Sequence, residues 1–213
     1  MLKEFRVSMP MSLEEYKVVQ FYNAAKSSNF NPLLGGRFSN KEYKKETMNL
    51  AGLVPDWFKP YMMTSDSLEY QAESWSAFPY RKVILTHKGY GTDNFNIEVE
   101  TSLFKGWGER ENVFNLNRKM LDQRAIYWFD LERDWKGSVS NVMTAYILVT
   151  PHVMGFGEIK NRQICEGIHK WMKDQLVSTH KTMVNQVDMW QGTLTMRDII
   201  ALEMEDSSED EEY

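Results

Sequence analysis

The stretch that decides the fold runs from Glu158 to Trp190 and reads EIKNRQICEGIHKWMKDQLVSTHKTMVNQVDMW. Its large apolar residues recur mainly three, four or seven positions apart and so form one stripe along an α-helix: Ile164, Ile168, Trp171, Met172, Leu176, Met183, Val187 and Trp190. An isolated amphipathic helix of this length is only marginally stable in water, so it needs a surface to cover. We therefore expect a long helix that packs against a sheet formed by the preceding chain.

The preceding chain contains patterns that are typical of strands. Phe95, Ile97, Val99 and Thr101 alternate with polar residues, as in a strand with one face buried. Further strands are predicted at Lys3–Met9, Tyr80–His87, Arg124–Leu131 and Val142–Thr150, with one or two exposed edge strands within Phe38–Asn49. The predicted fold class is α+β, with a curved antiparallel sheet wrapped around the long C-terminal helix.

Helix and domain signals complete the organisation of the chain. Ser12 and Glu15 have the spacing of a capping box, which predicts a helix from that point, and a short helix is expected at Asp56–Met62. No internal repeat or linker divides the chain, so we expect a single domain over residues 1–204. Residues 205–213 form an acidic run, which predicts a disordered tail.

Composition limits the classes of function. Of the 213 residues, 42% are hydrophobic and 13% are aromatic, which argues against a largely disordered chain. The net charge of −5 and the lack of a basic stripe argue against a nucleic acid partner. A single cysteine, Cys165, fits a reducing compartment. Since the sequence has neither a signal-peptide pattern nor a bilayer-spanning apolar run, we expect a soluble, cytoplasmic protein, and a monomer.

No motif in the sequence indicates catalysis or metal binding. The histidines lack the spacing of a metal site: His87, His152, His169 and His180. Asp130 and Glu132 end a predicted strand, with no nearby group to separate their pKa values. Gly155 and Gly157 lie between a strand and a helix, but Lys160 replaces the third glycine of a dinucleotide-binding loop. We therefore expect no catalytic site, no metal and no cofactor.

A series of short segments carries a family resemblance. In chain order these are Leu2–Val7, Glu15–Tyr22, Trp75–Tyr80, Ile97–Thr101, Glu111–Val113, Ala145–Thr150, Ile168–Lys170 and Leu194–Ile199. In this succession they resemble the phosphatidylinositol transfer proteins. The resemblance covers most of the chain, and its specificity comes from the order of the segments rather than from any one of them.

The resemblance implies a START-like helix-grip fold whose sheet and helices enclose one phospholipid in an internal apolar cavity. It implies transfer of phospholipid between membranes, classically phosphatidylinositol and phosphatidylcholine, with transient membrane contact. The alternative is a lipid sensor or presenter on the same fold, without net transfer. An enzyme on this scaffold would need an acid–base pair in the pocket, and the sequence offers none.

The same resemblance suggests lipid-binding residues. Gln20 and Thr101 match positions that contact the lipid phosphate in the family, and Glu203 matches an acidic residue that contacts the inositol ring. Without the resemblance they would be assigned to a helix-face amide, a buried strand threonine and an exposed helix carboxylate.

The family's inositol signature is altered in this chain. The best alignment places Lys44 and Glu46 at its threonine and lysine positions, and a shift of one residue would bring Lys45 to the lysine position. Ser76 replaces an asparagine, and Ile147 replaces a lysine. We therefore expect head-group recognition to differ from that of the family.

The loop before the long helix also departs from the family pattern. Met154 and Phe156 stand where the family has a membrane-inserting tryptophan pair. They are predicted to contact the membrane more weakly than tryptophans would, with a plain buried turn as the alternative.

Overall fold

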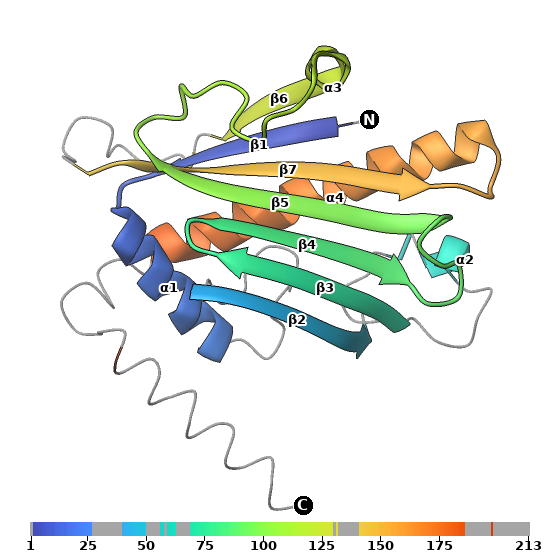
Figure 1. Cartoon of the computed structure of the whole chain (residues 1–213), viewed down its shortest axis with the longest axis horizontal. Helices are drawn as coiled ribbons and strands as arrows, with labels where there is room; N and C mark the ends of the chain where they lie inside the picture. The colour runs from blue at the N-terminus through green and yellow to red at the C-terminus, as the bar shows by residue number, and fades with distance from the viewer. Residues whose placement is uncertain are drawn as a thin grey trace, which may run out of the picture.

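The computed structural model describes residues 2–26, 40–49, 56–57, 59–62, 69–129, 131, 141–185 and 197. Its main feature is a seven-stranded sheet with the order β2-β3-β4-β5-β7-β1-β6 (Figure 1). The strands are β1 (Leu2–Met9), β2 (Asn40–Asn49), β3 (Glu69–Ala77), β4 (Tyr80–His87), β5 (Phe95–Lys105), β6 (Arg124–Phe129) and β7 (Met143–Val153). The predicted acidic tail, Glu132 and Asp130 lie outside the described residues.

One strand pair corrects the prediction of a purely antiparallel sheet. β6 lies beside β1 in parallel, with Leu2 opposite Arg124, whereas the other neighbouring pairs are antiparallel. β5 and β1 each pair antiparallel to β7, so β5, β1 and β6 run in the same direction. A parallel return needs a crossover of about a dozen residues or more. The connection between Lys105 and Arg124, which includes the short helix α3 (Arg118–Gln123), provides it.

Four helices are described alongside the sheet: α1 (Leu13–Lys26), α2 (Lys59–Met62), α3 and α4 (Glu158–Asn185). The predicted capping box starts α1, because the Ser12 amide donates to the Glu15 carboxylate at 2.6 Å and the Glu15 amide donates to Ser12 Oγ at 3.2 Å. The long helix begins at Glu158 as predicted, and its predicted last residues, 186–190, lie outside the described part. Among the described helices, none is long and apolar enough to cross a membrane.

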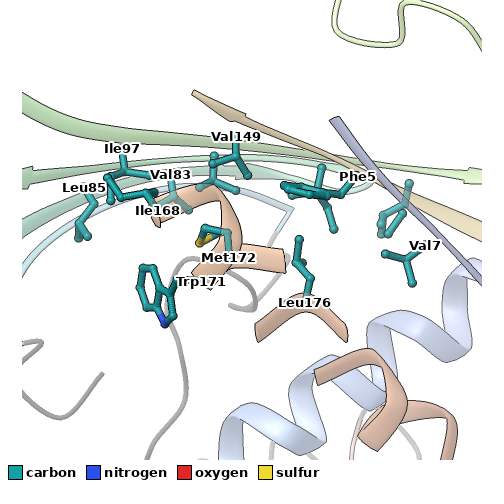
Figure 2. Close-up of a cluster of buried hydrophobic side chains, with 14 of the residues drawn as sticks. Phe5, Val7, Val83, Leu85, Ile97, Val149, Ile168, Trp171, Met172 and Leu176 are labelled. Carbon is teal, nitrogen blue, oxygen red and sulfur yellow. The ribbon is translucent and has the colours of Figure 1, made fainter. Parts of the chain in front are cut away.

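The core lies between α4 and one face of the sheet, here called the inner face. The helix packs against β7 and β1 and crosses the curved sheet on that side (Figure 1). Figure 2 shows Phe5, Val83, Ile97 and Val149 of the sheet close to the helix stripe that contains Met172. The described part of the predicted stripe is buried: Ile164, Ile168, Trp171, Met172, Leu176 and Met183. The helix–sheet contact predicted from sequence is therefore confirmed.

The opposite, outer face of β1 holds a buried ionic cluster. The Glu4 carboxylate bonds Arg6 Nε at 2.6 Å and Arg124 Nη1 at 2.6 Å, and all three side chains are at most 7% exposed. The Arg6 guanidinium also lies over the rings of Trp128 and Tyr146, about 5 Å from each centroid. This cluster fastens β6 to β1, because Glu4 and Arg124 belong to the two parallel strands.

Candidate functional site

Three polar side chains form a row across the inner face of three neighbouring strands. Arg81 on β4 lies opposite Ser76 on β3 and opposite Thr101 on β5. Residues in register across antiparallel strands share a face, and Arg81 alternates with the buried residues Val83 and Leu85. The row therefore faces the same side as the core, although its members are polar.

Helix α1 brings further polar groups to this side of the sheet. Gln20 and Tyr16 are 2% and 1% exposed, and Gln20 Nε2 donates to the Tyr16 hydroxyl at 2.7 Å. The Tyr16 hydroxyl also lies 3.3 Å from Nε2 of His180 on α4. Lys17 places its ammonium 5.1 Å from the ring centroid of Phe78, in the turn between β3 and β4. The helix thus lies beside the end of the β3–β4 hairpin where Ser76 and Arg81 are found.

The amide of Gln20 is incompletely paired. Its Oε1 atom is buried and has no hydrogen-bond partner among the described residues. Rotating the amide would let the Tyr16 hydroxyl donate to Oε1 and would leave the NH₂ group unpaired instead. Leaving a buried polar group without a hydrogen-bond partner lowers the stability of the protein. The unpaired atom of the Gln20 amide can therefore hydrogen-bond a ligand that occupies the site.

Burial determines the protonation of Tyr16 and influences that of Arg81. It raises the pKa of Tyr16 well above its usual range, so the phenol is neutral at physiological pH and can donate a hydrogen bond. Burial also lowers the pKa of Arg81 to about 10, against the opposing effects of Glu46 and Tyr16. Arg81 therefore remains a cation at neutral pH, in surroundings that are largely removed from water.

The sheet register separates the two candidate lysines on β2. Lys44 lies opposite Ser74 and shares the inner face with Ser76; its ammonium is 2.6 Å from the Glu46 carboxylate. Lys45 lies on the outer face, where it pairs with Glu73 at 3.0 Å. The first of the two alignments considered from sequence therefore uses two inner-face residues, Lys44 and Glu46. The shifted alignment instead puts Lys45, a residue of the outer face, at the family's lysine position.

The remaining candidates do not join this group. Glu203 lies outside the described residues. Met154 and Phe156 lie beyond the far end of β5, since the Met154 amide bonds the Asn94 carbonyl, and Thr101 is about 20 Å further along that strand. Met154 is 49% exposed, whereas Phe156 is half-buried with its ring 5.3 Å from that of Tyr90.

Sequence reasoning missed Arg81 and Tyr16 as members of the site. The segment from Arg81 to Leu85 shows no clear alternation of polar and apolar residues. One face carries Arg81 with Val83 and Leu85, and the other carries Lys82 with Ile84, so each face has a cation and an aliphatic side chain. Once the strand start at Tyr80 is known, the two-residue repeat from Leu85 and Val83 back to Arg81 places the guanidinium on the inner face. That repeat was the available signal.

The described histidines contribute no metal centre. His169 and His180 are buried, each with a ring nitrogen near a backbone carbonyl, and burial lowers the pKa of both to about 4. In the part of the chain that the structure describes, no three His, Cys, Asp or Glu side chains are grouped to hold a metal ion.

Comparison with known proteins identifies relatives along nearly the whole chain. A family model described as phosphatidylinositol transfer protein matches residues 1–134 and 129–208. Phosphatidylinositol transfer protein 2 of Dictyostelium discoideum is 25% identical over 98% of this chain and 95% of its own length. Membrane-associated phosphatidylinositol transfer protein 1 of Mus musculus is 30% identical over 63% of this chain, and the match spans 12% of that longer protein.

These matches agree with the observed architecture, a curved sheet and a long helix packed on its inner face. The resemblance seen in the ordered segments of the sequence is confirmed by a family model that covers well over half of the 213 residues. This chain belongs to the phosphatidylinositol transfer protein family.

Proposed function

We propose that this chain binds one phospholipid between its inner sheet face and its helices and exchanges it between membranes. The head-group phosphate lies against Gln20 and Thr101, with Ser76 and Lys44 nearby, and the acyl chains lie along the apolar part of the inner face. The observation that carries this proposal is the buried amide of Gln20, which has an unpaired atom among the described residues and lies beside an apolar core.

A phospholipid carrier needs both an apolar surface for the acyl chains and polar side chains for the head-group phosphate. Exposing acyl chains to water costs about 0.8 kcal/mol for each methylene, so a carrier must enclose them. A phosphate buried along with them must be hydrogen-bonded, because an unpaired polar group inside a protein is expensive. Two observations support this assignment of the phosphate to polar residues and the acyl chains to apolar ones. The chain belongs to the family, and the polar row lies beside the apolar core.

The finer assignments are part of the same proposal. Glu203 contacts the head group, and Met154 and Phe156 touch the bilayer while lipid enters or leaves. The chain acts in the cytoplasm as a monomer, carries phospholipid as cargo rather than as a cofactor, and performs no catalysis. The exposure of Met154 supports the membrane contact.

Transfer of fluorescent phospholipid between two vesicle populations tests the proposal. We expect Thr101→Trp to reduce loading of every phospholipid, because the indole would fill space on the inner face beside Arg81. Thr86→Trp is the matched control: Thr86 lies on the outer face, between Leu85 and His87, so its replacement leaves loading intact.

The outcomes separate the alternatives. Wild-type protein that neither retains nor moves phospholipid would refute the proposal. Normal loading with negligible exchange between vesicles would replace transfer by a sensor or presenter role. Equal loading of Thr101→Trp and wild type would show that the lipid lies elsewhere.

A further inference from the structure

The far end of the inner face holds two polar side chains on neighbouring strands. Tyr70 on β3 and His87 on β4 lie directly opposite each other, and they are 1% and 0% exposed. Their rings meet edge to face, with centroids 5.1 Å apart. Six residues of β4 separate His87 from Arg81, which lies opposite Thr101, so the two side chains, here called the His87–Tyr70 pair, lie about 20 Å from the polar row.

Each member of the pair has a polar atom that bonds nothing. The Tyr70 hydroxyl and Nε2 of His87 are buried, and neither has a hydrogen-bond partner among the residues that the structure describes. Nδ1 of His87 accepts hydrogen bonds from the backbone amides of Gly89 and Tyr90, at 2.9 and 3.3 Å. Because Nδ1 is an acceptor, the proton of the neutral ring is on Nε2. The pair therefore presents an N–H donor and a hydroxyl.

The His87–Tyr70 pair carries no charge at neutral pH. Burial raises the pKa of Tyr70 well above its usual range and lowers the pKa of His87. The charged residues next to them in sequence, Glu69 and Lys88, bind each other at 3.0 Å. Since no net charge lies beside the pair, its chemistry suits an uncharged oxygen better than an ion.

The surroundings of the pair are apolar. Ala72 and Leu85, the next inner-face residues along β3 and β4, are buried, and the ring of Phe95 lies 6.3 Å from the rings of both Tyr70 and His87. An ion would lose its hydration here without a compensating charge. A ligand that fits has an apolar body and a single uncharged oxygen. It gains affinity by pairing buried groups that are otherwise unsatisfied.

We propose that the His87–Tyr70 pair is a second lipid subsite, which binds a hydroxyl group on the distal part of an acyl chain and makes the chain prefer phospholipids with hydroxylated acyl chains. This inference rests on the proposed lipid-binding function and adds the class of acyl chain. With the head group at Thr101, the acyl chain extends along the inner face past Leu85 to the pair.

Competitive loading from mixed vesicles tests the inference. The purified full chain is incubated with vesicles of equal dioleoyl and diricinoleoyl phosphatidylcholine, which share a head group and differ by a hydroxyl beyond the middle of each acyl chain. The chain is re-isolated and its bound lipid is quantified by mass spectrometry. Wild type is expected to retain the hydroxylated lipid in excess. Tyr70→Phe removes only the phenolic hydroxyl and is expected to lower the ratio of hydroxylated to unmodified lipid about fivefold, from the net value of one hydrogen bond.

Two further variants complete the experiment. Tyr43→Phe is the matched control, because it makes the same change on the outer face, where Tyr43 is 53% exposed and its hydroxyl donates to Glu73 at 3.2 Å. It should keep the wild-type ratio. His87→Phe removes the N–H donor but keeps a ring at this position, and it should lower the ratio as Tyr70→Phe does.

Each result decides between the two levels of the proposal. If wild type retains neither lipid, the lipid-binding function itself is wrong. If wild type loads both lipids in the proportion of the vesicles, or if folded Tyr70→Phe keeps the wild-type ratio, the function stands and the second subsite is wrong. Circular dichroism establishes folding of each variant, and if one variant does not fold, the wild-type preference and the other variant decide.

Discussion

His180 is a buried histidine that the fold keeps neutral. Its side chain is fully buried, with Nδ1 2.7 Å from the Leu176 carbonyl and Nε2 3.3 Å from the Tyr16 hydroxyl. Burial lowers the pKa of His180 to about 4, and the Leu176 carbonyl opposes this effect. The native state therefore resists protonation at a pH where an unfolded chain, with a histidine pKa of about 6.5, accepts a proton.

The sign and size of the effect follow from this difference in pKa. Between pH 6.5 and about 4 the unfolded chain binds a proton at His180 that the native chain does not, so stability falls as the pH falls. The contribution of His180 is fully present above pH 6.5. About 2 kcal/mol of unfolding free energy is lost between pH 7 and pH 5, and about 3 kcal/mol once the pH is below 4.

Urea unfolding of wild type and His180→Phe at pH 7 and pH 5 measures this contribution. Phenylalanine does not titrate and keeps a ring beside Tyr16, whose ring is stacked with that of His180. Because other titrating groups are common to both proteins, the variant should lose about 2 kcal/mol less than wild type between the two pH values. Ser178→Ala, at an exposed position of α4, should keep the wild-type dependence. The same loss in wild type and His180→Phe would refute a buried neutral His180.

Two further predictions concern stability. Leu176→Ala removes a fully buried side chain of the helix stripe and should lower the free energy of unfolding by about 2–5 kcal/mol, measured by urea denaturation; a loss below 1 kcal/mol would contradict the tight helix–sheet contact. Glu4→Gln removes the carboxylate that bonds both Arg6 and Arg124, and should cost about 3–5 kcal/mol in the same assay. A neutral effect there would mean that the ionic cluster does not fasten β6 to β1.

The elements with strong local patterns were predictable from sequence. The capping box at Ser12 marks the start of α1, the apolar stripe marks α4, and Tyr80–His87 is a strand in both prediction and structure. These features depend on neighbours a few residues away, which a sequence displays directly. The parallel direction of β6 depends instead on where a long connection returns, and no local pattern encodes it.

Strand β3 was missed because its regular alternation, with Tyr70 and Ala72 buried, reverses at its C-terminal end. Ser76 is buried on the inner face, while its neighbour Trp75 is 37% exposed on the outer face. Read by hydrophobicity alone, this pair suggests the opposite orientation. A polar residue at a buried strand position is expected near a site that holds a polar ligand, so the exception coincides with the candidate site.

The candidate site was predictable only in part. The family resemblance suggested Gln20, Thr101 and Ser76, and the structure places Thr101 and Ser76 on either side of Arg81 with Gln20 on the adjoining helix. Arg81 was not predicted, because a cation beside a second cation on a strand resembles a solvated edge. The roles of these residues toward a lipid stay predictions, as do those of Glu203 and the loop at Met154.

Native mass spectrometry of the purified full chain tests the central claim most directly. If the chain encloses one phospholipid, the spectrum contains protein whose mass exceeds that of the 213-residue chain by one phospholipid, and collisional activation releases that lipid. A spectrum with only the mass of the bare chain, both as purified and after incubation with phospholipid vesicles, would contradict the account.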